Sequence, residues 1–333
     1  MISLLSVPQP RKSLVKGERF IRSDYKTETM EKKIRGMLRQ KFGDLFRTLP
    51  RHHRAVQRAT FATHPTFSTV DAAEVQKFSD KSAEWWDPEG EFSMLQLLNP
   101  PRVAYVRDQL NTNPARPSKP FEGLRMLDIG CGGGLLSESL CRLGGTVVGA
   151  DASGDNIKMA KLHSRKDPML WKGPGKLDYR HTTAEDLLAA EESFDVVLAM
   201  EIIEHVNQPL DFLRTCAQLT RPDGRLFLST MGRTPIAYGL TVLLAEDILG
   251  LVHKGTHDWS KYIKSKELID AVHSFGQEWV VESVRGIRWD PILRKWHVFE
   301  QEGMVGIGGF ESLEVNYILS ARRRIITQET LVA

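Results

Sequence analysis

The stretch Leu127-Asp-Ile-Gly-Cys-Gly-Gly-Gly134 decides the fold. It joins a strand expected at residues 125–130 to a helix expected at 135–143. Glycines at such a turn let a ligand touch the backbone, and the start of the helix presents unpaired N–H groups. The stretch therefore predicts a binding loop between the first strand and the first helix of an α/β domain.

The spacing of the glycines separates two kinds of nucleotide site. A dinucleotide fingerprint needs a glycine or alanine at position 135 or 137, and this chain has leucine and serine there. Asp128, followed by Gly130, Gly132 and Gly134, instead resembles motif I of class I S-adenosylmethionine methyltransferases. Asp151, 21 residues past Gly130, can accept both ribose hydroxyls of a bound adenosine. A purely structural turn is the alternative.

Beyond the loop the chain alternates between expected strands and helices. Further strands are expected at 146–151, 177–183, 194–200, 225–230, 279–284 and 315–321, and further helices at 155–163, 210–219 and 266–275. This alternation is typical of a parallel sheet with helices on both faces. We expect a doubly wound α/β fold with a mostly parallel, seven-stranded, Rossmann-like methyltransferase sheet, helices before it, and an apolar insertion after the fifth strand.

Acidic residues and a histidine follow the fourth expected strand. Met200 is succeeded by Glu201, Glu204 and His205. If a helical turn starts there, the last three share one face and can hold a divalent cation. The alternative is a metal-free site in which they orient the cofactor or a helix.

Charge divides the 333-residue chain in two. Residues 1–67 carry 15 Lys/Arg and 5 Asp/Glu, whereas residues 68–333 carry 30 and 37. An acidic main domain argues against nucleic acid as a partner. Three cysteines without metal-type spacing favour a reducing compartment. No run reaches the roughly 18 apolar residues that span a bilayer.

The basic leader, residues 1–67, has apolar residues at helical spacing from Met30 to Leu49. Residues 50–67 contain no acidic residue. Such a segment resembles a mitochondrial transit peptide. A cationic arm on a cytosolic protein is the alternative. We therefore divide the chain into this leader and one domain, 68–333, with an insertion at 232–262.

Motifs spread along the domain resemble the ubiquinone-biosynthesis O-methyltransferase family. They are Phe78–Asp87, Glu89–Phe92, Leu98–Arg102, the glycine loop, Glu201–Val206, Lys254–Asp258 and Val315–Ile318, in family order. The chain departs from compact bacterial members in its leader and in the segments 111–120 and 165–176.

This resemblance implies a cofactor, a metal and a location. S-adenosylmethionine would be held by Arg102, Gly130, Asp151 and Met200, and Asp128 and Gly132 of the motif I loop are predicted to bind it as well. Mg²⁺, or another divalent metal, would be held by Glu201, Glu204 and His205. The reactions would be O-methylations of a polyprenyl dihydroxybenzoate and of a demethylated ubiquinol. The enzyme would lie peripherally on the matrix face of the mitochondrial inner membrane, in a complex with other coenzyme Q enzymes.

The chemistry requires a phenolate, because a phenol with a pKa near 10 is mostly protonated at neutral pH. A metal chelated by two adjacent ring oxygens would lower that pKa. His205 or His257 can accept the proton, and a structural role for His257 is the alternative.

The apolar residues of 235–252 are expected to contact a membrane and admit a polyprenyl tail, unless they form an ordinary core helix. Two other functions remain open at this stage. One is methylation of carbon, nitrogen or an RNA ribose, and the other is an inactive subunit of an assembly.

Overall fold

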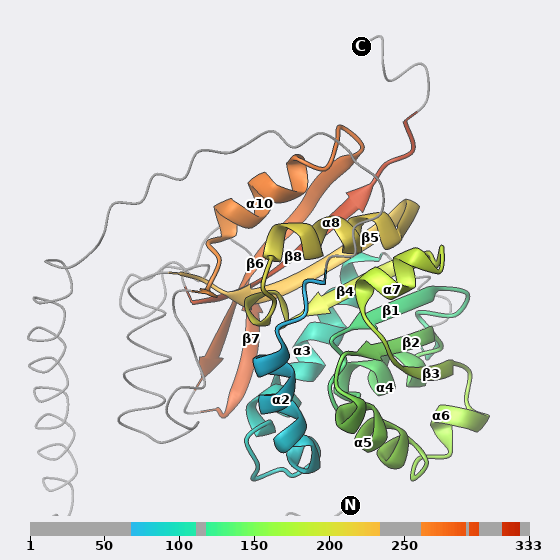
Figure 1. Ribbon diagram of the computed structural model, residues 1–333. Coiled ribbons are helices and arrows are strands. Elements are labelled where there is room, and N and C mark those ends of the chain that lie inside the picture. The colour runs from blue at the N-terminus through green and yellow to red at the C-terminus, as the bar shows by residue number, and fades with distance from the viewer. Residues whose placement is uncertain (1–67, 111–117, 234–260, 291–292, 300–314, 327–333) are drawn as a thin grey trace, which may run out of the picture. The chain divides into compact units, whose positions relative to one another are not determined.

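The computed structural model describes residues 68–110, 118–233, 261–290, 293–299 and 315–326. In this part of the chain one sheet has helices on both faces (Figure 1), in the strand order β3-β2-β1-β4-β5-β8-β6-β7. The expected α/β, doubly wound architecture is confirmed. The leader, most of the insertion at 232–262 and His257 lie outside the described residues.

Five parallel strands form the half of the sheet that contains the glycine loop. They are β1 (Arg125–Ile129), β2 (Thr146–Asp151), β3 (Lys176–His181), β4 (Phe194–Met200) and β5 (Thr220–Met231). Because β2 and β4 flank β1, the winding direction reverses between β1 and β4. Ligands of open α/β sheets bind beyond the carboxyl ends of the strands at such a reversal.

The remaining strands are antiparallel and enlarge the sheet beyond the expectation. They are β6 (Trp279–Asp290), β7 (Lys295–Phe299) and β8 (Asn316–Arg323). The expected number of seven strands is wrong, since the described residues contain eight in this sheet. The missed strand is β7, a short edge strand that pairs only with β6 in a hairpin. Its five residues, Lys-Trp-His-Val-Phe, do alternate, but the run is too short for the pattern to distinguish a strand from a loop.

Helices cover the two faces of the sheet in separate groups (Figure 1). Buried residues of α3 (Ser93–Gln109) and α4 (Leu135–Arg142) pack on one face, and α5 (Gly154–Ser164) packs beside them on β3. The opposite face carries α7 (Ala184–Ala189), α8 (Pro209–Leu219) and α10 (Ser265–His273). The shorter helical elements are α2 (Ala72–Asp80), η1 (Ser82–Glu84), α6 (Met169–Lys172) and η2 (Ile203–His205).

Side-chain alternation explains why the core has two faces. In β1 the side chains of Leu127 and Ile129 pack with α7 and α8, whereas Met126 packs with α3 and α4. Central parallel strands buried in this way carry near-continuous apolar runs. A buried polar residue in such a strand, such as Asp128 in β1, therefore indicates a part of the sheet that is used for binding or catalysis as well as for packing.

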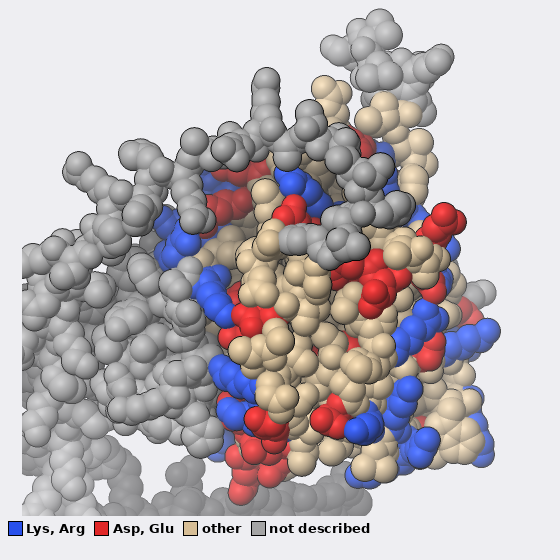
Figure 2. Space-filling view, viewed as in Figure 1, with Lys and Arg blue, Asp and Glu red and all other residues tan. Residues whose placement is uncertain are grey.

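Charged side chains are interspersed on the face seen in Figure 2, where Lys/Arg and Asp/Glu of the described residues lie side by side. Among the described residues no helix has both the length and the apolar character needed to cross a bilayer.

Candidate active site

The glycine loop is held in a conformation that only glycine adopts readily. Gly130, Gly132 and Gly134 have φ values of +73°, +54° and +87°. A Cβ atom on Gly132 would overlap the ring of Trp85, and one on Gly134 would overlap the Tyr179 hydroxyl. The glycines were expected to admit a ligand. In the structure, protein side chains occupy the space, so the glycines also serve close packing.

Asp151 ends β2 beside this loop, as the sequence predicts. Its Oδ2 accepts a hydrogen bond from the Gly132 N–H at 2.8 Å, and its Oδ1 accepts one from the Ser153 N–H at 2.8 Å. Asn156 Nδ2 lies 3.3 Å from the same Oδ1. Burial raises the pKa of Asp151. A carboxylate has about four lone-pair sites, so this fixed group can still accept hydrogen bonds from a diol.

Two tryptophans from the segment before α3 fasten the loop. Trp85 Nε1 donates to Asn156 Oδ1 at 2.9 Å, and Trp86 Nε1 donates to the Gly133 carbonyl at 2.9 Å. The Trp85 ring also stacks on Phe92, with 3.8 Å between ring centroids. Both tryptophans therefore pack against the loop and hydrogen-bond to groups in or beside it.

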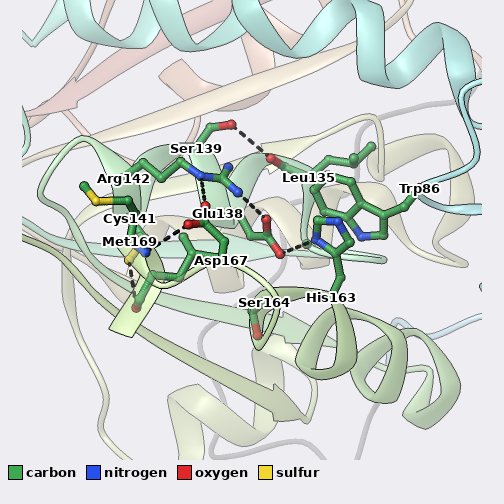
Figure 3. A network of polar contacts seen from close by, with 12 residues as sticks. Trp86, Leu135, Glu138, Ser139, Cys141, Arg142, His163, Ser164, Asp167 and Met169 are labelled. Atoms are coloured by element: carbon green, nitrogen blue, oxygen red, sulfur yellow. Dashed lines mark hydrogen bonds and ion pairs between the residues drawn. The ribbon is translucent and has the colours of Figure 1, made fainter. Parts of the chain in front are cut away.

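A polar network supports the helix that follows the loop (Figure 3). Trp86 stacks on His163, with 3.4 Å between centroids, and His163 Nδ1 lies 2.8 Å from Oε1 of the fully buried Glu138. Arg142 bridges Glu138 at 2.8 Å and Asp167 at 2.7 Å. Because a buried carboxylate needs such partners, the network fixes α4 against α5. The glycine loop is thereby supported from both sides.

Arg102 lies inside the molecule, on the face of α3 that is turned to the sheet. It is 4% exposed, its Nη2 lies 3.4 Å from Asn99 Oδ1, and its Nε has no hydrogen-bond partner in the part of the chain that the structure describes. Burial lowers its pKa, while the charges of Glu201 and Asp128 oppose that shift. A buried guanidinium with an unpartnered donor suits an anionic ligand group.

Asp128 lies in the middle of the same region. Ser137 Oγ donates to its Oδ2 at 2.5 Å, and burial raises its pKa to about 6. Ser137 of α4 and Arg102 of α3 stabilise its charge from one face of the sheet, whereas the Asp151 carboxylate at the end of β2 opposes it. Asp128 therefore holds the start of α4 through Ser137 and stabilises the positive charge of Arg102.

Glu201 turns the chain away from β4 at a strained residue. Its φ is +54°, its N–H donates to the Ser229 carbonyl at 3.0 Å, and Ser229 Oγ donates to its Oε1 at 2.6 Å. Burial, and next the nearby Glu204 charge, raise the pKa of Glu201 to about 7. Non-glycine residues in this region of φ concentrate at functional sites.

The prediction of a helical turn that begins at Glu201 is wrong. The 3₁₀ helix η2 covers only Ile203–His205, because the Glu201 N–H continues the pairing with β5 and the left-handed φ interrupts the helix. Glu204 is buried and accepts from Thr230 Oγ1 at 2.9 Å. The α-helical spacing from which a shared face was inferred therefore does not exist.

His205 is held by residues that the sequence did not point to. Its Nδ1 lies 3.0 Å from Glu74 Oε2, and its ring meets Phe78 edge-on at 4.9 Å. Lys261 Nζ contacts the other oxygen of Glu74 at 3.0 Å. The hydrogen bond with His205 and then the Lys261 contact lower the pKa of Glu74 to about 2. No local pattern reveals a partner 131 residues away.

Comparison with known proteins agrees with this geometry. A family model described as a methyltransferase domain matches residues 127–228. A ubiquinone biosynthesis O-methyltransferase of Cereibacter sphaeroides is 43% identical over 259 residues, which cover 77% of this chain and 98% of that protein. One from Ruegeria pomeroyi is 43% identical over 263 residues, covering 78% and 98%. The chain belongs to the ubiquinone biosynthesis O-methyltransferase family. The resemblance found in its motifs is confirmed.

A member of the ubiquinone biosynthesis O-methyltransferase family uses S-adenosylmethionine, and the described residues fit that cofactor. The unpartnered Arg102 Nε suits the carboxylate of its methionine part, and the Asp151 carboxylate suits its ribose. Met200 is buried. It is the last residue of β4 and directly precedes Glu201. The assignment of individual cofactor contacts stays a prediction.

The metal expected for this family member fits less well. The donors are of suitable chemistry, and Ser229, Thr230 and Glu74 are outer partners of the kind that ligands need. Yet among the described residues no three His, Cys, Asp or Glu side chains gather closely enough to hold one ion. Glu201, Glu204 and His205 remain predicted ligands, and no chemical step is derived from a metal.

Proposed function

We propose that this family member transfers the sulfonium methyl group of S-adenosylmethionine to a ring hydroxyl of a polyprenyl dihydroxybenzoate and of a demethylated ubiquinol. One observation carries the proposal: Asp151, Arg102, Glu201 and His205 all belong to the carboxyl end of the parallel strands or contact residues there. A cofactor and a phenolic acceptor bound at one edge can meet in line, and such positioning supplies much of the rate.

The chain's own residues divide the task. Arg102 and Asp151 hold the two ends of the cofactor, which supplies the electrophilic methyl carbon. The acceptor must lose a proton from its oxygen, and we propose His205 as the base. Glu74 binds its Nδ1, so the neutral ring keeps Nε2 as the proton acceptor. The predicted second candidate, His257, lies outside the described residues and remains an alternative base.

Several finer expectations stay proposals. Divalent-metal assistance through Glu201, Glu204 and His205 is one of them, and it is the alternative to His205 as base, because an Nε2 atom that binds a metal cannot also accept the proton. Work at the matrix face of the mitochondrial inner membrane, in a complex with other enzymes of quinone synthesis and without nucleic acid, is another. The basic sequence of residues 1–67 supports the mitochondrial location, and the apolar residues of 235–252 support the membrane contact.

The deciding experiment is methyl transfer from labelled S-adenosylmethionine by the full chain to a prenylated catechol, with an RNA acceptor alongside. We expect label only in the catechol. Chelation followed by Mg²⁺ tests the metal in the same assay, because loss and recovery of activity support it and indifference to chelation removes it. Label in RNA alone, or in neither acceptor, would overturn the proposed function.

The membrane proposal has a separate test in liposome binding. Replacing Leu243 and Leu244 by aspartate should release the protein from vesicles while cofactor affinity stays unchanged, because charge opposes burial in the interface. Vesicle binding at the original level would remove residues 234–252 as the anchor.

A further inference from the structure

Asn316, the first residue of β8, has a buried side chain whose amide oxygen lacks a partner. It is 8% exposed, and its Oδ1 makes no hydrogen bond with any residue that the structure describes. Buried amides are nearly always hydrogen-bonded, and one left unpartnered destabilises a fold. A ligand that supplies the missing donor explains the exception.

The face to which Asn316 belongs follows from strand alternation. Ser320 Oγ donates to Gln109 of α3 at 3.2 Å, and Ile318 packs in the cluster that contains Tyr105 of α3. Residues two and four positions apart in a strand share a face. Asn316 therefore lies on the side of the sheet that α3 covers, which is also the side of Arg102.

The edge to which Asn316 belongs follows from strand direction. It pairs with Met231, the last residue of β5, in an antiparallel register. β8 therefore starts where β4 and β5 end, next to the Ser229 hydroxyl that holds Glu201. The residues suited to ribose lie on β2, on the other side of β1 and β4. Asn316 is thus placed on the acceptor side of the candidate active site.

We propose that the Asn316 amide binds the ring hydroxyl that neighbours the methylated one, and so selects vicinal dihydroxy aromatic acceptors. The inference rests on the proposed function and deepens it. An uncharged amide oxygen accepts a hydrogen bond from a hydroxyl that keeps its proton, whereas the reacting hydroxyl must lose its own.

A second buried atom without a described hydrogen-bond partner lies on this face, and it suits a different ligand group from the Asn316 oxygen. Arg102 Nε is a cationic donor and suits a carboxylate, as the cofactor carries. Asn316 Oδ1 is a neutral acceptor and suits a hydroxyl. A carboxylate placed against Oδ1 would be repelled, so the two atoms select different partners at one edge.

The test compares two acceptors in the full chain with S-adenosylmethionine. One is a prenylated catechol, and the other is the same molecule without the second hydroxyl. Asn316→Leu removes both polar atoms at nearly constant shape, so the variant is expected to fold at least as stably. Asn316→Ala is the second variant. Ser320→Ala, on the same face of β8 but distant from the edge, is the matched control.

We expect both Asn316 variants to lower kcat/KM for the catechol about tenfold and to change it less than about twofold for the monohydroxy analogue. Affinity for S-adenosylhomocysteine stays at the parent value, and Ser320→Ala keeps the parent preference. Equal losses for both acceptors, or a catechol preference that survives in Asn316→Leu, would overturn the assignment. If the parent protein methylates neither acceptor, the proposed function fails first, and that result is distinguishable from a failure of Asn316 alone.

Discussion

The two halves of the strand-end edge differ in how completely their polar groups are paired. In the half formed by β1 and β2, the Asp151 carboxylate, the loop carbonyl of Gly133 and the buried Glu138 all have protein partners. In the half formed by β4, β5 and β8, the half-buried Glu201 lies near the buried Glu204, each beside one hydroxyl, and the Asn316 oxygen has no partner among the described residues.

This difference shows which half is finished before ligands bind. Apart from Arg102 Nε, the donors and acceptors of the cofactor half are already paired, so cofactor binding needs little reorganisation. In the acceptor half, the unpaired Asn316 oxygen and the neighbouring Glu201 and Glu204 carboxylates destabilise the free protein. A bound acceptor or cation would relieve this destabilisation. Variants in the first half should therefore affect stability and cofactor affinity, and variants in the second should affect turnover and selectivity.

The largest effect is expected for Gly132→Ala. The new methyl group would overlap Trp85 at a φ of +54°, which disfavours alanine. We expect a loss of more than about 3 kcal/mol in unfolding free energy, together with loss of cofactor binding. Urea denaturation and calorimetric titration with S-adenosylhomocysteine measure both.

Gly123→Ala provides the matched control for this variant. Gly123 also has a positive φ, +88°, but nothing lies within 4 Å of the Cβ it would gain. It should lose only about 1–2 kcal/mol, from backbone strain alone. Equal losses for the two variants would mean that the Trp85 contact does not shape the loop.

The sequence predicts the first half well because its determinants are local. β2 has the expected bounds, and the glycine loop and Asp151 lie where their strand ends place them. The second half depends on pairing between distant segments. The Glu201 turn is set by a hydrogen bond to β5, and the bond between His205 and Glu74 spans 131 residues. The unpartnered Asn316 oxygen becomes visible only when the fold is known.

A second effect concerns pH. The pKa of Asp128 is raised from its usual 3.8 to about 6, so the folded protein binds this proton more tightly than the unfolded chain does. Its stabilisation is fully present below about pH 3.8 and is lost as pH rises to about 6. Asp128→Asn should remove that loss, and the variant should gain on the order of 3 kcal/mol over the parent at pH 7.

Denaturation of Asp128→Asn and of the parent between pH 4 and 7 checks this prediction. The Asn oxygen can still accept from Ser137, so the packing stays comparable. The difference in unfolding free energy should be small at pH 4 and increase toward pH 7. A difference that is independent of pH would show that burial does not raise this pKa.

Arg102 tests where the boundary between the halves lies. We expect Arg102→Met to weaken S-adenosylmethionine binding about 10- to 100-fold, because a charge-assisted contact to the carboxylate contributes about 1.5–3 kcal/mol. The decarboxylated cofactor should bind the parent and the variant alike. If both cofactors lose affinity equally, Arg102 serves the acceptor half or the fold instead.

The smallest effect separates the two tryptophans. Trp85→Phe keeps an aromatic ring against the loop but removes the hydrogen bond to Asn156, which in turn contacts Asp151. We expect a loss of about 1 kcal/mol, or about fivefold in cofactor affinity, since the carboxylate stays in place but is less firmly oriented. A cofactor analogue without the ribose hydroxyls should show no such loss, because the Asp151 orientation matters only for the diol.

Trp86→Phe, which loses the bond to the Gly133 carbonyl, should weaken both ligands to the same small degree. If Trp85→Phe also weakened both equally, the ring would act by packing alone, and the cofactor half would owe its order to the glycines rather than to its hydrogen bonds.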